Sequence, residues 1–307
     1  MDSKQKIALV LSGGGARGLS HIGAIEVLEK YGFQINAIAG TSAGSLIGGL
    51  YAMGYMTEFR DWVCKLRRRD ILSLMDFTIK GGGIVKGKKM FDKLKTFIPD
   101  TKIETLIIPF VAVATDILNI KEIAFREGSV FKAIRASVSV PDFFTPVEYN
   151  ETLLVDGGVL NPVPISQVKR EEGDILVVVN LYDYKLKYNN LVEEYHLTHK
   201  DEKQKLSSFI KFLKEWQKKI KESINKEDKK SIGYIKLLEI STDTMVNKIA
   251  DLTIEKYKPD ILINLPSDSA KLLDFDKAHE LISIGRMQAE KALEEYFAKN
   301  KEKQNPT

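Results

Sequence analysis

The sequence predicts an α/β protein in which a mostly parallel sheet is flanked by helices, a three-layer sandwich. Two observations support this prediction. The chain has 307 residues, of which 44% are hydrophobic, enough to bury one substantial core. Stretches with helical periodicity also alternate with short apolar runs, which are typical of buried strands and lie at 7–11, 35–39, 108–114, 175–179 and 261–265. This alternation favours a parallel sheet covered on both faces.

The N-terminal elements have the clearest pattern. A predicted strand at 7–11 leads into a glycine-rich loop at 13–18, and a helix is predicted from 19 to 31 because apolar residues recur on one face. The second strand, at 35–39, leads directly into a predicted helix at 43–53. Each of these two strands therefore ends in a turn that opens a helix.

Residues 56–105 depart from this pattern. They include a triple glycine at 81–83 and a set of closely spaced basic residues: Arg67, Arg68, Arg69, Lys86, Lys88 and Lys89. We interpret the segment as a solvated helix and loop that cover the site described below. The alternative is a basic lip that meets anionic lipid head groups.

Residues 183–230 are interpreted as a polar, lysine-rich helical insertion within a single domain of residues 1–307. Apolar residues recur at helical spacing over 206–224 with lysines around them, which predicts an amphipathic helix. Such a helix needs a partner for its apolar face. Packing against the body of the protein or another subunit is favoured, and an anionic membrane or a mobile flap are the alternatives. The last predicted helix runs from 277 to 300.

Composition excludes several classes of protein. The net charge of +4 is too small to indicate nucleic-acid binding. Cys64 is the only cysteine, which excludes an internal disulfide and a cysteine-based metal site. No run of about 18 apolar residues predicts a transmembrane helix, and the run at 7–11 is too short for a signal-peptide core. We therefore expect a cytoplasmic protein that is at most peripheral to the membrane.

The most informative motif is Gly40-Thr41-Ser42-Ala43-Gly44. It matches G-x-S-x-G and stands between a predicted strand and a predicted helix, which is the context of a nucleophile elbow. Glycines on both sides of Ser42 leave room for a tight turn that exposes the serine hydroxyl above the sheet. The N-terminus of the following helix favours negative charge at the same place. Ser42 is therefore the candidate nucleophile of an acyl hydrolase.

The glycine-rich loop is the candidate oxyanion hole. Neighbouring parallel strands bring this loop and the elbow to the same edge of the sheet, so the N–H groups of Gly14 and Gly15 are expected to face Ser42. Each such donor lowers the barrier by roughly 3–4 kcal/mol. The loop also matches G-x-G-x-x-G, but residues 34–39 lack the acidic residue that a dinucleotide site needs there. The candidate donors are Gly13, Gly14, Gly15, Ala16, Arg17 and Gly18.

Asp156 is one candidate for the base that accepts the proton of the nucleophile. It ends a short apolar strand and is followed by Gly157 and Gly158. An ordinary Asp-Gly turn is the alternative interpretation. An aspartate base needs an apolar, water-poor setting that raises its proton affinity. Esters and thioesters suit such a weak base better than amides.

A histidine is the other candidate for the base. His21 lies on the first predicted helix and is expected to pack there, and His196 and His199 fall in the insertion. His279, near the start of the last helix, is the one that an α/β-hydrolase with a Ser-His-Asp triad would use. That fold usually carries its elbow after several strands, whereas here the elbow follows the second.

Three blocks stand in order along the chain: GGGARG at 13–18, GTSAG at 40–44 and DGG at 156–158. Together they resemble the patatin-like phospholipase family, especially its compact bacterial cytoplasmic members. The likeness extends over residues 6–182 and 231–295. Further stretches that look similar are VATD at 113–116, AIRASVSVP at 133–141 and the segment 275–285.

The resemblance implies a patatin-like catalytic domain with a Ser–Asp dyad, in which Ser42 is the nucleophile and Asp156 the general base. It assigns the oxyanion hole to 13–18, where Arg17 either braces the loop or lies near a head group or a fatty-acid carboxylate. The implied activity is hydrolysis of lipid acyl esters, as a phospholipase A, lysophospholipase or esterase, through an acyl-enzyme intermediate. No metal or cofactor is implied. Glycine at 158, where many members have alanine, leaves the dyad unimpaired.

Two other functions remain open at this point. One is a catalytically silent lipid-binding or regulatory protein that keeps the fold. The other is an α/β-hydrolase with a triad. The expected partner is a lipid or acyl-ester substrate, with peripheral membrane contact as a further possibility and no nucleic acid. Turnover of a short-chain p-nitrophenyl ester, lost in Ser42→Ala, separates the enzyme from the silent protein.

Overall fold

A computed structural model describes residues 5–78, 82–189, 191 and 234–304. The chain divides into two compact units, one of residues 1–186 and 246–307 and one of residues 187–245. The first unit contains the sheet and every motif discussed above. The amphipathic helix predicted at 206–224 lies outside the described residues.

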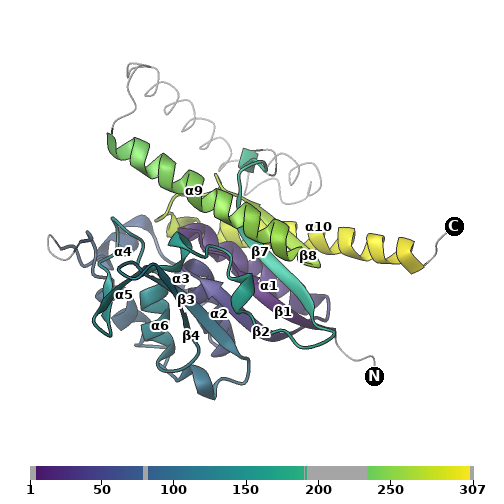
Figure 1. The fold of residues 1–307 in the computed structure, drawn as a ribbon, viewed down its shortest axis with the longest axis horizontal. Helices are drawn as coiled ribbons and strands as arrows, with labels where there is room; N and C mark the ends of the chain where they lie inside the picture. Colours follow the sequence, from purple (N-terminus) through teal and green to yellow (C-terminus); the bar gives the residue numbers. More distant parts are fainter. Residues whose placement is uncertain (1–4, 79–81, 190, 192–233, 305–307) are drawn as a thin grey trace. The chain divides into compact units, whose positions relative to one another are not determined.

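Eight described strands form one sheet (Figure 1). They are β1 (Lys6–Leu11), β2 (Gln34–Thr41), β3 (Phe110–Asp116), β4 (Lys121–Phe125), β5 (Val147–Tyr149), β6 (Thr152–Asp156), β7 (Ile175–Asp183) and β8 (Ile261–Pro266). The order is β5-β6-β3-β2-β1-β7-β8, and β4 also pairs with β3. The five strands from β3 to β8 in this order are parallel, whereas β4 and β6 run antiparallel to β3 and β5 antiparallel to β6.

The central strands are buried on both faces, which explains their nearly continuous apolar sequence. Residues 7–11 of β1 are fully buried, and so are residues 177–179 of β7. Alternate side chains serve opposite faces of the sheet. Val10 packs with Ala250 of helix α9 (Tyr234–Tyr257), while Leu11 approaches Gly48 of helix α2 (Ala43–Ala52).

Helices therefore cover both faces of the sheet. The helices α1 (Ser20–Lys30), α2 and α10 (Ala278–Gln304) pack together on one face, with α1 and α10 in extensive contact. The part of α9 that belongs to the first unit covers the other face. The predicted fold class, a mostly parallel sheet flanked by helices in a three-layer sandwich, is confirmed.

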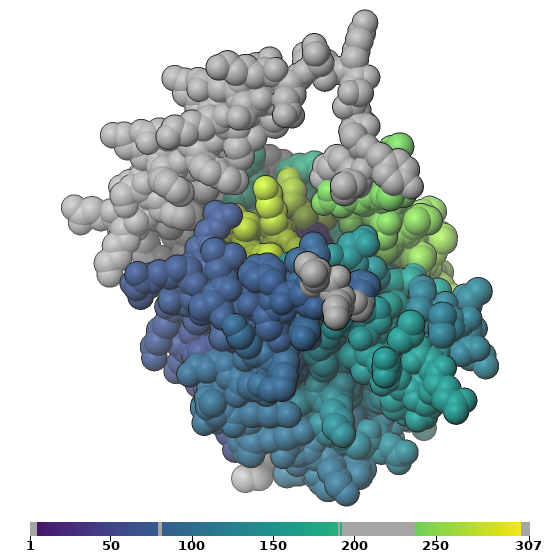
Figure 2. All heavy atoms as spheres, turned by 90° about the vertical axis from the view of Figure 1, so that its left-hand side faces the viewer, coloured from purple at the N-terminus to yellow at the C-terminus, as the bar shows by residue number. Residues whose placement is uncertain are grey.

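The segment at 56–105 forms three short helices and a turn: α3 (Met56–Val63), α4 (Arg68–Ser73), α5 (Lys88–Leu94) and η2 (Ile103–Thr105). Figure 2 faces this segment, which is blue and forms much of the visible surface of the first unit. Another helix, α6 (Val130–Ser137), packs against β3 and β6. The other short helical turns among the described residues are η1 (Gly15–Leu19), η3 (Gly157–Val159), η4 (Ile165–Gln167) and η6 (Phe275–Lys277).

No helix in the described part of the chain has the length and apolar character needed to cross a membrane.

Candidate active site

Ser42 stands at the turn between β2 and α2, in a conformation that residues with a side chain rarely adopt. Its φ is 53° and its ψ is −123°. Such strain costs on the order of 1–3 kcal/mol and persists only when the surroundings impose it. The close packing of the turn is one such constraint, because a Cβ on Gly44 would lie 2.1 Å from the backbone oxygen of Leu11.

The register of the sheet brings Asp156 next to Ser42. The last residue of β2, Thr41, pairs with Val113 of β3, and the next residue of β3, Ala114, pairs with Asp156 of β6. The strand β4 occupies the other edge of β3 over this length. Hence β2 and β6 lie one after the other along the same edge of β3, and Ser42 and Asp156 lie where the carboxyl ends of these two strands meet.

This approach depends on glycine after Asp156. A Cβ on Gly157 would lie 2.2 Å from the backbone oxygen of Val113, which is closer than any side chain tolerates. The Asp156 N–H donates to the backbone oxygen of Ser139 at 2.9 Å. The turn after Asp156 is therefore fixed by backbone contacts, and the close approach to Val113 requires glycine at position 157.

The carboxyl group of Asp156 is buried. Burial raises its pKa to about 6, an effect partly offset by the Ser42 hydroxyl and by the N–H of Gly158. That N–H donates to Asp156 Oδ1 at 2.7 Å. The Ser42 hydroxyl is near enough to stabilise the carboxylate, yet no fully formed hydrogen bond joins the two groups, and Asp156 Oδ2 is buried without a partner among the described residues.

The glycine loop lies against Ser42, because a Cβ on Gly13 would be 3.3 Å from the Cβ of Ser42. Two N–H groups of the loop are engaged elsewhere: Gly13 donates to Pro162 O and Ala16 to Leu272 O, both at 3.0 Å. In the described part of the chain, no acceptor pairs with the N–H of Gly14, Gly15 or Ala43. These N–H groups remain available to a bound oxyanion.

Arg17 braces the glycine loop. Its guanidinium donates to the backbone oxygens of Gly14, Leu181 and Ser267 at 3.1, 3.2 and 2.6 Å. It also lies over the ring of Tyr182, 5.9 Å from the centroid. The resemblance left two positions open for Arg17: bracing the loop, or lying near a head group or a fatty-acid carboxylate. The hydrogen bonds in the structure correspond to the first of these.

The histidines hold different positions. His21 is buried, with Nε2 2.9 Å from the backbone oxygen of Ser12, and burial lowers its pKa to about 4. It therefore packs as a neutral side chain beneath the loop. His279 is exposed on α10, and His196 and His199 lie outside the described residues. Among the described residues, no hydrogen bond links Ser42 to a histidine, and no cluster of His, Cys, Asp and Glu side chains is suited to a metal ion.

Ser137 is a positioning residue that the sequence analysis did not identify. Its hydroxyl accepts a hydrogen bond from the N–H of Ser42 at 2.9 Å and donates to the backbone oxygen of Val113 at 2.5 Å. It thus ties the strained elbow to β3 at the level of Asp156. The sequence offered a signal in the block at 133–141, where serines cluster at the end of a predicted helix.

We expect Ser137→Ala to lower kcat about tenfold or more, because an unpaired buried N–H and carbonyl cost roughly 1–3 kcal/mol each and the elbow then relaxes. KM should change little, since Ser137 does not line the pocket. Ester kinetics measure this split. Ser137→Thr, which keeps the hydroxyl, should recover part of the rate, and a rise in KM alone would contradict the positioning role.

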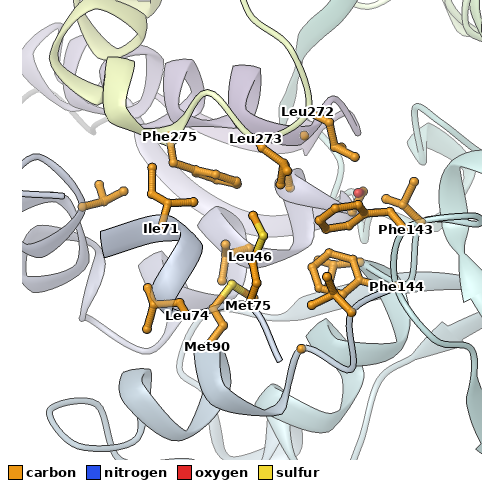
Figure 3. Close-up of a pocket in the computed structure, with 18 of the residues that line it drawn as sticks. Leu46, Ile71, Leu74, Met75, Met90, Phe143, Phe144, Leu272, Leu273 and Phe275 are labelled. Carbon is orange, nitrogen blue, oxygen red and sulfur yellow. The ribbon is translucent and has the colours of Figure 1, made fainter. Parts of the chain in front are cut away.

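An apolar cavity of about 110 Å³ opens beside Ser42 (Figure 3). Leu272, Phe143 and Phe144 border one side of it, and Ile71 of α4 and Leu74, the residue that follows α4, lie opposite. Half of the lining comes from the segment 56–105, which therefore covers the site. The lining residues are Gly15, Ser42, Ala43, Leu46, Phe59, Trp62, Val63, Leu66, Ile71, Leu74, Met75, Val85, Gly87, Met90, Leu94, Val138, Val140, Phe143, Phe144, Leu272, Leu273 and Phe275.

Comparisons with known proteins find a matching family and several relatives. A family model described as patatin-like phospholipase matches residues 9–169, slightly more than half of the chain. An uncharacterised NTE family protein of Mycobacterium tuberculosis is 40% identical over 179 residues, which are 58% of this chain and 50% of that protein. The lysophospholipase NTE1 of Meyerozyma guilliermondii is 33% identical over 183 residues, 58% of this chain and 13% of that protein.

The chain thus spans half or less of the length of these curated relatives. Among solved structures, VipD from Legionella pneumophila superposes with a TM-score of 0.48 at 15% identity, covering 95% of this chain and 67% of that one.

Proposed function

The chain belongs to the patatin-like phospholipase family, a family of lipid acyl hydrolases, and on this premise we propose that it hydrolyses lipid acyl esters through Ser42 and Asp156. One observation carries the proposal. The strained Ser42, which lines an apolar cavity, lies next to the buried carboxyl group of Asp156, whose pKa is raised. A nucleophile, a base and a place for an acyl chain are thereby combined at one edge of the sheet.

In the proposed reaction, the Asp156 carboxylate takes the proton of the Ser42 hydroxyl as its oxygen attacks the acyl carbonyl carbon. The N–H groups of Gly14 and Gly15 donate to the oxyanion of the tetrahedral intermediate. Its collapse breaks the bond to the leaving alkoxide, which takes the proton back from Asp156. Water then attacks the carbonyl carbon of the acyl-enzyme and gives a proton to Asp156. Collapse of this second intermediate breaks the bond to Ser42 Oγ, which takes that proton back, and the carboxylic acid leaves.

The cavity supports a substrate with a long unbranched acyl chain. The side chains of its lining residues are apolar except for the Ser42 hydroxyl and the indole nitrogen of Trp62. Burying a methylene group in such a setting contributes about 0.8 kcal/mol. Cleaving an ester bond to glycerol, with the acyl chain in this cavity, is the activity of a phospholipase A or a lysophospholipase.

Narrowing the cavity tests this assignment. Met75 and Met90 both line it, and methionine side chains fill irregular apolar spaces (Figure 3). We expect Met90→Trp to lower kcat/KM for a long-chain p-nitrophenyl ester about tenfold, with little effect on a short-chain ester, because only the long chain reaches the added ring.

The matched control is Met245→Trp, at a methionine that is 58% exposed and does not line the cavity. It should leave both esters unaffected. Equal losses on short and long esters in Met90→Trp would place the acyl chain elsewhere. Mass spectrometry of lipids exposed to the active protein and to Ser42→Ala then identifies the lipid class that is consumed.

A further inference from the structure

The segment at residues 65–95 has an unusual charge. It holds ten Lys and Arg residues and three Asp residues, a net charge of +7, whereas the whole chain carries only +4. The rest of the molecule is therefore slightly acidic. A charge asymmetry of this size favours an anionic partner for the face that carries it.

The three aspartates of this segment are already engaged. Asp70 pairs with Arg67 and Arg69, Asp92 pairs with Lys88, and Asp76 accepts hydrogen bonds from the backbone N–H groups of Gly87 and Lys89. Among the described residues, no ion pair involves the exposed cations Lys65, Arg68, Lys86 and Lys89. These cations are available to an anionic surface.

The same segment exposes large apolar side chains. Leu72 is 52%, Phe77 62% and Ile84 54% exposed. The backbone beside these residues is paired: Phe77 and Val85 form an antiparallel bridge, and the N–H of Thr78 donates to Ile84 O at 2.8 Å. Two hydrogen-bonded backbone segments that expose Phe77 and Ile84 to solvent gain nothing from internal packing of these side chains.

Inward and outward side chains alternate along this segment. Ile71 and Leu74 line the cavity while Leu72 between them faces outward, and Val85 lines the cavity while Ile84 faces outward. The outward apolar side chains are therefore separated from the cavity only by the backbone that carries both sets of side chains. Leu272, across the cavity from α4, both lines it and is 36% exposed (Figure 3).

We propose that this apolar lip, made of Leu72, Phe77 and Ile84 with the surrounding cations, docks on an anionic lipid surface. The apolar side chains enter the boundary between head groups and acyl chains, and the lysines and arginines contact the phosphates. This inference rests on the proposed function in one respect: docking there places the cavity beside the lipid that it is to receive. The binding itself requires no catalysis.

Binding of the full chain carrying Ser42→Ala to vesicles tests the proposal without hydrolysis. The probes are vesicles of phosphatidylcholine and of an equal mixture of phosphatidylcholine and phosphatidylglycerol, and cosedimentation measures the partition coefficient. The protein should bind the mixed vesicles much more tightly, and binding should weaken as salt rises.

Phe77→Ser combined with Ile84→Ser should lower the partition coefficient about tenfold or more, because two apolar side chains lose their burial. Lys86→Gln combined with Lys89→Gln should have an effect of similar size on mixed vesicles only. The matched control is Ile107→Ser. Ile107 is an apolar residue that is 98% exposed, and it precedes the amino end of β3, whereas Ser42 lies at the carboxyl ends of the parallel strands. It should bind as the parent does. Unchanged circular dichroism verifies that each variant is folded.

The proposal is overturned if the parent binds neither vesicle, if the lip variants bind as well as the parent, or if Ile107→Ser loses as much binding as they do. Binding to a protein but to no vesicle would likewise overturn it. Hydrolysis of a soluble ester is measured separately with the Ser42 side chain intact. A protein that binds vesicles as expected but cleaves no ester would sink the proposed function and leave the docking surface standing.

Discussion

Ser42→Ala should lower kcat for an acyl ester about 10,000-fold or more, because no other group in the site is placed to attack the carbonyl carbon. Among the described residues that line the apolar cavity, Ser42 is the only one with a hydroxyl group, and the N–H groups of Gly14 and Gly15 in the neighbouring loop have no acceptor within the described part of the chain. Steady-state turnover of a p-nitrophenyl ester measures the loss.

A serine of similar burial gives the control for this result. Ser20 is fully buried and its hydroxyl has no hydrogen-bond partner among the described residues. Ser20→Ala should keep full turnover, so a loss in Ser42→Ala then reflects chemistry rather than packing. If Ser42→Ala retained a tenth of the parental rate, the nucleophile would lie elsewhere.

Asp156→Asn should lower the rate and raise stability in the same molecule. Loss of a general base costs about 100- to 10,000-fold in rate. Stability changes in the opposite direction because burial raises the pKa of Asp156 from 3.8 to about 6. Between these two values the folded protein binds more protons than the unfolded chain, so the stability contributed by this group falls as pH rises.

The raised pKa of Asp156 corresponds to about 3 kcal/mol of destabilisation of the folded protein above pH 6. Asparagine carries no charge and therefore avoids this destabilisation. The free energy of unfolding of Asp156→Asn should therefore exceed that of the parent at about pH 8 by up to about 3 kcal/mol, and the gain should vanish at about pH 4. Urea denaturation at the two pH values measures it. A variant that loses both activity and stability would assign Asp156 a structural role instead.

The fold was predictable from the sequence because its central strands are buried on both faces. Such strands carry continuous apolar runs, and β1, β2 and β7 are recognisable for this reason. The short strands β4 and β5 are half-exposed, so they lack a run that the sequence reveals. The position of β6 depends on its pairing with β3, where β6 lies beyond the end of β2 along the same edge of β3. This pairing joins residues far apart in the sequence, so local sequence patterns do not reveal it.

The candidate site was partly predictable for a related reason. The elbow and the glycine loop are local motifs at strand ends, and the parallel sheet brings them together. Ser137 was not identified, because its role depends on two hydrogen bonds to residues far away in the sequence. The apolar cavity was missed as well, since α3, α4 and α5 are short helices, and their polar and basic residues obscure the pattern of the apolar side chains that face inward.

The most direct test of the central claim is the site and pH dependence of a covalent adduct. A fluorophosphonate reacts with an activated serine, and peptide mass mapping locates the product. We expect one adduct, on Ser42, with a rate of formation that rises with pH and levels off above an apparent pKa near 6, the value for Asp156. Asp156→Asn should form it slowly and without this pH dependence. An adduct on another residue, or equally rapid labelling of Asp156→Asn, would contradict the Ser42–Asp156 mechanism.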